Sequence, residues 1–306
     1  MPTSDTNPLI ELDWVNFNPR SVATVTHRIS GHDLLQPQQL VELGERLEQQ
    51  GRVRSHSNTA AADTPFNDAP DLHPNRTSSK QTLEHIREAR AWLSLLNVQA
   101  DPVYRKLVDE VLDSVRPLVE AKDPGMCYRG GWIFVSSPRT VTPFHFDKEH
   151  NFILQIHGRK TIYVWEPTDL VVADDQARDR FHARRQRDKV LWKEEFRNRA
   201  HRFDLGPGQG AYMPSTSPHL VEVGDEPSVT VSFTYYTNST RRDAVLRAAR
   251  GRLTEMGMNL PAVGQRPWLD AALYGGAVSA RAVKGAISRI RGKQTWLDGA
   301  LYAQPR

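Results

Sequence analysis

The segment Val141–Asp147, which reads VTPFHFD, carries a histidine and an aspartate two residues apart. Side chains alternate between the two faces of a β-strand, so His145 and Asp147 share one face if the segment is extended. Phe144 and Phe146 then point the other way, into a core. An imidazole and a carboxylate side by side are two ligands of a 2-His-1-carboxylate site, which typically holds non-haem Fe(II). The alternative is a hydrogen-bonded His/Asp pair, because H-x-D also occurs by chance.

The third ligand must be a histidine from a distant strand, and His219 is the best candidate. It follows the turn-forming run Pro214–Pro218 and enters a predicted strand directly, as a ligand at the rim of a barrel would. The sequence therefore predicts His145, Asp147 and His219 as the metal ligands. Four other histidines are poorer candidates, since they lie at strand ends near the motif or in a charged segment where solvation is expected: His150, His157, His182 and His201.

Lys160 begins the second strand of a predicted hairpin, 15 residues after His145. A lysine directed into an apolar barrel is costly unless an anion compensates its charge, and the alternative is a hairpin lysine in water. The distal carboxylate of 2-oxoglutarate is such an anion, and the Thr142 hydroxyl would add a donor to it. Asn151 starts the strand beside the metal motif and would reach the keto-acid end of the same co-substrate.

Short strands separated by Gly/Pro turns fill the second half of the chain, from Gly130–Gly131 onward. This pattern predicts a mainly β core, a closed antiparallel barrel or jelly roll of the double-stranded β-helix type used by cupins. The predicted strands are 132–135, 145–147, 151–157, 161–165, 202–205, 210–213, 220–223 and 228–236.

Helical and irregular segments surround this core and suggest three regions. Residues 1–125 are a helical and irregular N-terminal region, 126–238 are the barrel, and 239–306 are a basic helical segment. Apolar spacing predicts helices at 38–50, 81–96 and 102–118. Two segments flank the expected barrel mouth: a long polar loop at 51–80 and a charged, Arg-rich helical insertion at 166–200.

The composition is that of a soluble protein: 306 residues, 39% hydrophobic and 25% charged. No apolar run is long enough for a membrane span, and the polar N-terminus does not resemble a secretory leader. The single cysteine, Cys127, excludes an intramolecular disulfide, is expected to be a small buried packing residue and suits a reducing cytoplasm. Residues 241–306 carry 12 Lys/Arg against 4 Asp/Glu. A solvated face of amphipathic helices is favoured there over a nucleic-acid surface.

Two blocks resemble the JmjC-type cupin oxygenases: TPFHFDKEHNFILQIHGRKTIYVWEP and GPGQGAYMPSTSPHLVEVGDEPSVTVSFTYY. They are most similar to the hydroxylase branch that contains the asparaginyl hydroxylase of hypoxia-inducible factor. The resemblance covers residues 128–237 and implies Fe(II) at the predicted triad and 2-oxoglutarate as co-substrate. Ser232 stands near an asparagine of that hydroxylase and is assigned to the co-substrate pocket with Lys160, Thr142 and Asn151. No tyrosine partner is evident; the candidates are Tyr128 and Tyr163.

The implied reaction is hydroxylation of a C–H bond in a peptide or protein side chain or in a small molecule, with succinate and CO₂ as co-products. Hydroxylation of an N-methyl group would lead to demethylation. The alternatives are a non-catalytic cupin module that binds a ligand and regulates a partner, and a cupin that uses another divalent metal for isomerase or hydrolase chemistry. The arginines of 166–200 suit an acidic peptide or an anionic small molecule, or else a solvated face. The helices after residue 238 resemble dimerisation helices, so a homodimer is expected.

Overall fold

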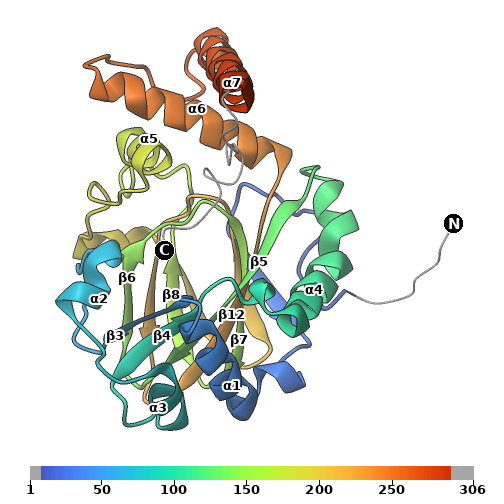
Figure 1. Ribbon diagram of the computed structural model, residues 1–306, viewed down its shortest axis with the longest axis vertical. Coiled ribbons are helices and arrows are strands. Elements are labelled where there is room, and N and C mark those ends of the chain that lie inside the picture. Colours follow the sequence, from blue (N-terminus) through green and yellow to red (C-terminus); the bar gives the residue numbers. More distant parts are fainter. Residues whose placement is uncertain (1–7, 291–306) are drawn as a thin grey trace, which may run out of the picture.

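Residues 8–290 are described by the computed structural model, and they form two antiparallel sheets (Figure 1). The strands are β1 (Ile10–Glu11), β2 (Ala23–His27), β3 (Val53–Ser57), β4 (Ala91–Leu95), β5 (Cys127–Ser136), β6 (Val141–His145), β7 (His150–His157), β8 (Lys160–Val164), β9 (His201–Leu205), β10 (Gln209–Met213), β11 (His219–Val223) and β12 (Ser228–Tyr236).

The winding of β5 to β12 is that of a double-stranded β-helix. The larger sheet has the order β1-β2-β10-β7-β12-β5-β4-β3, and the smaller sheet has the order β6-β11-β8-β9. Strands β5, β7, β10 and β12 of the barrel therefore lie in one sheet, and β6, β8, β9 and β11 lie in the other. This arrangement confirms the predicted jelly roll, and seven of the predicted strands overlap observed ones closely. The strand predicted at 145–147 is instead β6, which ends at His145, so Asp147 lies in the loop that follows.

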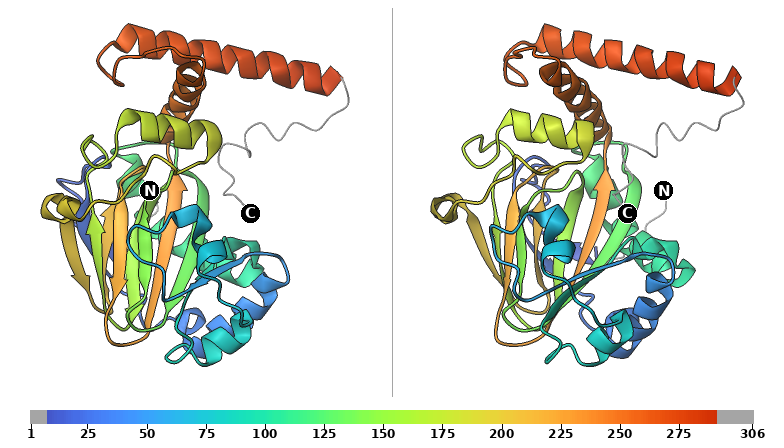
Figure 2. Two further views of the ribbon diagram at one scale, coloured as in Figure 1. Left: turned by 90° about the vertical axis from the view of Figure 1, so that its left-hand side faces the viewer. Right: turned by 60° about the vertical axis from the view of Figure 1, so that its left-hand side comes forward.

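The helices cover one side and one end of the barrel. In Figure 2 the last two helices stand away from the barrel, beyond the helix of the insertion. The helices are α1 (Pro37–Glu48), α2 (Ala69–Leu72), α3 (Ser79–Glu84), α4 (Pro102–Glu120), α5 (Asp175–Arg184), α6 (Asn238–Glu255) and α7 (Pro267–Ile290), with 3-10 turns at Asp33–Leu35, Phe66–Asp68, Val98–Ala100 and Glu194–Arg199. The part of the predicted C-terminal segment beyond residue 290 lies outside the described residues.

The two faces of the larger sheet follow the strand alternation of the sequence. On β7, Phe152 and Leu154 point outward and pack with Leu107 and Val111 of α4 in the main hydrophobic core. Ile153, between them, faces the barrel interior and belongs to a second cluster with residues of the smaller sheet. Among the described residues, no helix is long and apolar enough to span a membrane.

The N-terminal region contributes β1 to β4, which are not among the eight predicted strands. The segment 51–80, predicted as a loop, contains β3, and the predicted helix 81–96 is instead α3 followed by β4. All five residues of β4 are buried, because the strand lies between β3 and β5 in the sheet. A strand buried on both faces reads as a continuous apolar run, which periodicity cannot distinguish from a short helix. Cys127 is half-buried at the start of β5, whereas full burial was expected.

The charged insertion is less solvated than its composition predicted. Helix α5 packs on α6, and this contact buries His182, for which a solvated role was expected. Asp179 of α5 accepts hydrogen bonds from Arg247 (3.1 Å) and Arg250 (2.9 Å) of α6. Arg247 also pairs with Asp175 at 3.0 Å. This α5–α6 ion cluster attaches the C-terminal helices to the insertion.

Candidate active site

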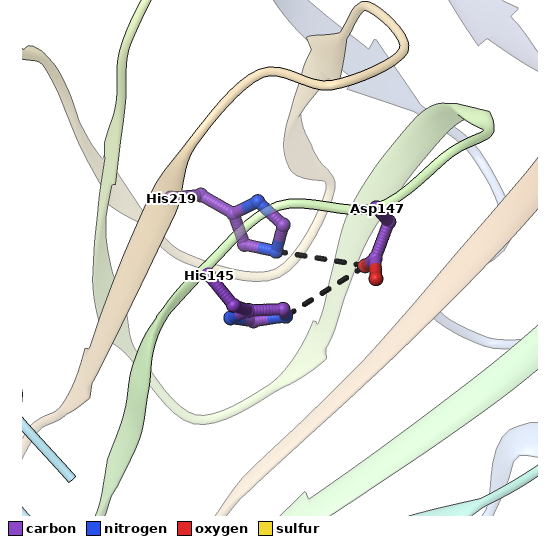
Figure 3. Close-up of side chains that lie close together, drawn as sticks. All are labelled: His145, Asp147 and His219. Atoms are coloured by element: carbon purple, nitrogen blue, oxygen red, sulfur yellow. Dashed lines mark ion pairs between the residues drawn. The ribbon is translucent and has the colours of Figure 1, made fainter. Parts of the chain in front are cut away.

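His145, Asp147 and His219 converge at one end of the smaller sheet (Figure 3). His145 is the last residue of β6, Asp147 lies in the loop that follows, and His219 is the first residue of β11. The two histidines are direct cross-strand partners. The Nε2 atoms of His145 and His219 lie 3.7 and 3.8 Å from Oδ2 of Asp147. All three ligand atoms lie within 4.8 Å of one another, so one ion can contact all of them.

Backbone carbonyls determine the tautomer of both histidines. Nδ1 of His145 lies 2.7 Å from the Pro143 carbonyl, and Nδ1 of His219 lies 3.1 Å from the Ser217 carbonyl. A carbonyl only accepts hydrogen bonds, so each Nδ1 carries the proton and each Nε2 keeps its lone pair. Burial also lowers the pKa of both imidazoles, most strongly that of His145. Both rings are therefore neutral and present a lone pair toward Asp147, as metal ligands must.

Arg187 orients the third ligand. Its Nη2 donates to Oδ1 of Asp147 at 2.7 Å, which leaves Oδ2 facing the histidines. Its Nε donates to the Phe146 carbonyl at 2.9 Å, and its Nη1 donates to Oδ1 of Asn67 at 2.8 Å. Arg187 was predicted as part of an anion-binding or solvated arginine face, but it is buried and holds the carboxylate. Outer-shell partners of this kind fix ligand orientation.

The donor set fits a divalent first-row metal. Two imidazole nitrogens and one carboxylate oxygen are the facial triad of non-haem Fe(II) sites, which leave positions open for other ligands. The hydrogen bond from Arg187 balances the negative charge on Oδ1 of Asp147, the oxygen that is turned away from the histidines. The residues present thus match an Fe(II)-type centre.

A cavity of about 600 Å³ opens from this triad into the barrel and contains Lys160 in its wall. The Lys160 side chain is buried, and no ion pair or hydrogen bond joins it to any residue between 8 and 290. Burial alone lowers the pKa of its amine to about 7. The alternative that Lys160 is a solvent-exposed hairpin residue is therefore wrong. Its amine instead lies inside the cavity without an anionic partner among the described residues.

The other three predicted pocket residues line the same cavity from both sheets. Thr142 of β6 lies in the smaller sheet, as Lys160 does. Asn151 of β7 and Ser232 of β12 lie in the larger sheet. Oδ1 of Asn151 and Oγ of Ser232 are buried without a hydrogen-bond partner among the described residues. Buried polar atoms are nearly always paired, so these two atoms call for a polar partner between the sheets, either ordered water or a polar ligand.

Neither candidate tyrosine belongs to this cavity. Tyr128 is exposed at the start of β5 and packs edge-on against Tyr236. Tyr163 of β8 faces outward, where the Arg197 guanidinium lies 4.6 Å from its ring centre. The aromatic residue that lines the cavity beside Ser232 is its cross-strand partner, Trp132. The structure therefore supports neither candidate, since neither side chain lines the cavity.

Phe66 and Arg54 are two site residues that the sequence analysis missed. The Phe66 ring stacks on His145 with centroids 3.6 Å apart and planes 9° apart, and Arg54 lies over the same ring at 4.2 Å. Both come from the segment predicted as a polar loop. The only signal for them was the unusual length of that segment, which is typical of functional loops.

The comparison with family models agrees with this architecture. Residues 24–241 match the model of a family described as a cupin-like domain. An X-ray structure of YcfD from Escherichia coli is similar at 17% identity and a TM-score of 0.47, covering 86% of this chain and 63% of that chain. YcfD, a ribosomal oxygenase, in complex with cobalt and 2-oxoglutarate matches at 16% identity and a TM-score of 0.43, over 84% and 61%. This chain thus spans less than two thirds of that protein. No curated protein matches the chain.

Proposed function

We propose, from the premise that this chain belongs to the cupin-like domain family, that it is an Fe(II)- and 2-oxoglutarate-dependent oxygenase. One observation carries the proposal: the His145–Asp147–His219 cluster and the unpaired Lys160 line one cavity of about 600 Å³. A cupin with another metal chemistry has no need for a buried, uncompensated cation beside its metal. The reaction would hydroxylate a C–H bond of a peptide, protein side chain or small molecule, with succinate and CO₂ as co-products.

The chain's own residues would hold the metal and keep its position stable. His145, His219 and Asp147 would be the ligands, with Arg187 preventing rotation of the carboxylate. The bound iron would supply oxygen activation coupled to decarboxylation of 2-oxoglutarate. Phe66 covers one face of His145 and would exclude water from that side of the centre.

The cavity residues would bind the co-substrate by charge and hydrogen bonding. The Lys160 ammonium would neutralise the distal carboxylate of 2-oxoglutarate, and the Thr142 hydroxyl would donate to it. Asn151 and Ser232, whose buried oxygen atoms have no partner among the described residues, would contact the co-substrate from the opposite sheet. Trp132 would form the apolar wall between these groups.

The proposal is tested by two measurements on the intact protein. We expect anaerobic titration to show 2-oxoglutarate binding that requires Fe(II) or Co(II). In air and with ascorbate added as the reductant in place of the principal substrate, the Fe(II) protein should release succinate and CO₂ slowly. Binding of metal without 2-oxoglutarate would refute the oxygenase and favour a cupin of other chemistry. Binding of neither would favour a non-catalytic module.

We expect 2-oxoglutarate binding to weaken as pH rises through neutrality. Burial lowers the Lys160 pKa to about 7, so the ammonium predominates below that pH and the neutral amine above it. A dicarboxylate binds the ammonium form, so above about pH 7 binding takes up a proton, and Kd rises by up to about tenfold per pH unit. Calorimetry in buffers of different ionisation enthalpy measures both effects. A Kd independent of pH would contradict this role of Lys160.

We further infer a homodimer and a cytoplasmic location. Helix α7 exposes Trp268 (68%), Val278 (41%) and Val283 (59%) on an arm that stands away from the barrel (Figure 2). Exposed apolar side chains grouped in this way favour a protein interface. Light scattering should give the mass of two chains, and a monomer at micromolar concentration would refute the dimer. A single cysteine is typical of a reducing compartment.

A further inference from the structure

The cavity continues past the co-substrate residues onto β3 and β4, which extend the larger sheet beyond the barrel. Arg54 of β3 is the cross-strand partner of Ser94 of β4, and Ser94 is the partner of Phe134 of β5. These three side chains therefore stand in one row across the sheet, and all three line the cavity. Trp92, two residues before Ser94, lines it as well.

Two arginines line this cavity, and their environments differ. Arg187 is engaged by Asp147, Asn67 and a backbone carbonyl. Arg54 donates to the Phe66 carbonyl, but its buried Nε has no hydrogen-bond partner and it forms no ion pair with any residue that the structure describes. The Arg54 side chain is half-buried, and a guanidinium with an unpaired donor matches the planar geometry of a carboxylate.

The position of Arg54 relative to the metal ligands is set by Phe66. Its guanidinium lies 4.2 Å from the centre of the Phe66 ring, and the opposite face of that ring stacks on His145. Arg54 is thus separated from His145 by one aromatic ring. Its strand β3 belongs to the larger sheet, whereas Lys160 lies on β8 of the smaller sheet. The buried Oγ of Ser94 also has no partner among the described residues. Trp92 and Phe134 provide an aromatic wall beside these polar groups.

We infer that Arg54 binds a carboxylate of the molecule that this enzyme oxidises, with Ser94 as a second donor and the aromatic wall holding its apolar part. The inference rests on the proposed function, because it assigns the substrate class of the same site. Lys160 and Arg54 would then select two different anions, the co-substrate and the substrate, at opposite parts of one cavity.

The test uses Co(II)-loaded full-length protein, anaerobic and saturated with 2-oxoglutarate so that the Lys160 side is filled. Calorimetry measures Kd for two matched pairs of acid and neutral amide. One pair is phenylacetate and phenylacetamide, which represent a small organic acid. The other is acetylated, amidated Gly-Glu-Gly and Gly-Gln-Gly, which represent an acidic side chain of a peptide. Each pair differs only in the charged group.

In at least one pair the acid should bind the wild-type protein at least about tenfold more tightly than the amide, as expected for a charge-assisted bidentate contact. The discriminating pair identifies the source of the carboxylate. Arg54→Gln should abolish the preference without changing Kd for 2-oxoglutarate. Arg28→Gln, at an arginine 48% exposed and paired with Glu11 on the far edge of the sheet, should retain it.

Equal binding of acid and amide to the wild-type protein in both pairs would overturn the inference, as would a preference that survives Arg54→Gln. If that variant does not fold, Arg54→Lys takes its place. Lysine keeps the positive charge but not the paired donors of the guanidinium, so this variant should reduce the preference for the acid over the amide. An unchanged preference would again overturn the inference. Failure of the proposed function is distinguishable, because 2-oxoglutarate itself would then not bind.

Discussion

His219→Ala is expected to abolish metal-dependent activity and to leave the protein folded. The substitution leaves His145 and Asp147, whose ligand atoms are 3.7 Å apart, as a two-ligand site. Removing a group that only supports a ligand typically costs 10–100-fold in metal affinity, and loss of a ligand should cost about 100-fold or more. Succinate release should accordingly fall below about 1% of the wild-type rate.

Thermal unfolding gives a second readout that does not depend on turnover. A metal that binds only the folded state raises its stability, so Co(II) should raise the wild-type Tm and leave that of His219→Ala unchanged. The matched control is His201→Ala, since His201 is exposed on β9 and its one ion pair within the described part of the chain is with Glu166. Wild-type metal affinity in the His219 variant would show that a different histidine completes the site.

Lys160→Met should act in opposite directions on binding and stability. Loss of a buried charged partner weakens anion binding by about 2–5 kcal/mol, so Kd for 2-oxoglutarate should rise by about 100-fold. The free protein should become more stable by about 2 kcal/mol, because an apolar side chain replaces an uncompensated buried amine. Calorimetry and urea unfolding without ligand measure the two effects. A less stable variant, or one that binds 2-oxoglutarate normally, would contradict the assignment of Lys160.

The control for this prediction is Lys193→Met. Lys193 is 61% exposed and forms a long pair with Glu195. Surface substitutions of this kind change stability by less than about 0.5 kcal/mol and should not affect the cavity. Comparing the two variants separates the consequence of removing a buried amine from that of removing any lysine.

The sequence predicted the barrel, and which three side chains come together in it, because the relevant signals are local. The alternation of side chains along a strand places His145 and Phe144 on opposite faces. His219 directly follows a turn-forming run, so it is expected at the start of a strand. The structure brings both histidines together as cross-strand partners. Lys160 could also be identified from the sequence, because a charged residue at the start of an apolar strand is unusual and requires a partner of opposite charge.

The missed residues act through contacts that no local pattern encodes. Arg187 lies 40 residues from Asp147 in the chain, within a segment whose charge suggested solvation. Phe66 reaches His145 from a segment read as a polar loop. The strand β4 was mistaken for a helix because burial on both faces removes the alternation by which strands are recognised.

The α5–α6 ion cluster means that the C-terminal arm cannot be trimmed without consequence at a distance. Burial raises the pKa of Asp179 to about 6 even with Arg247 and Arg250 beside it. A gene shortened to end after β12 would delete both cations together with the helix that packs on α5, so α5 would lose its main packing partner and its ion pairs. The disturbed helix immediately precedes the turn that carries Arg187. Removing the C-terminal helices would therefore disturb the segment that carries Arg187, and the metal ion would dissociate faster from the site.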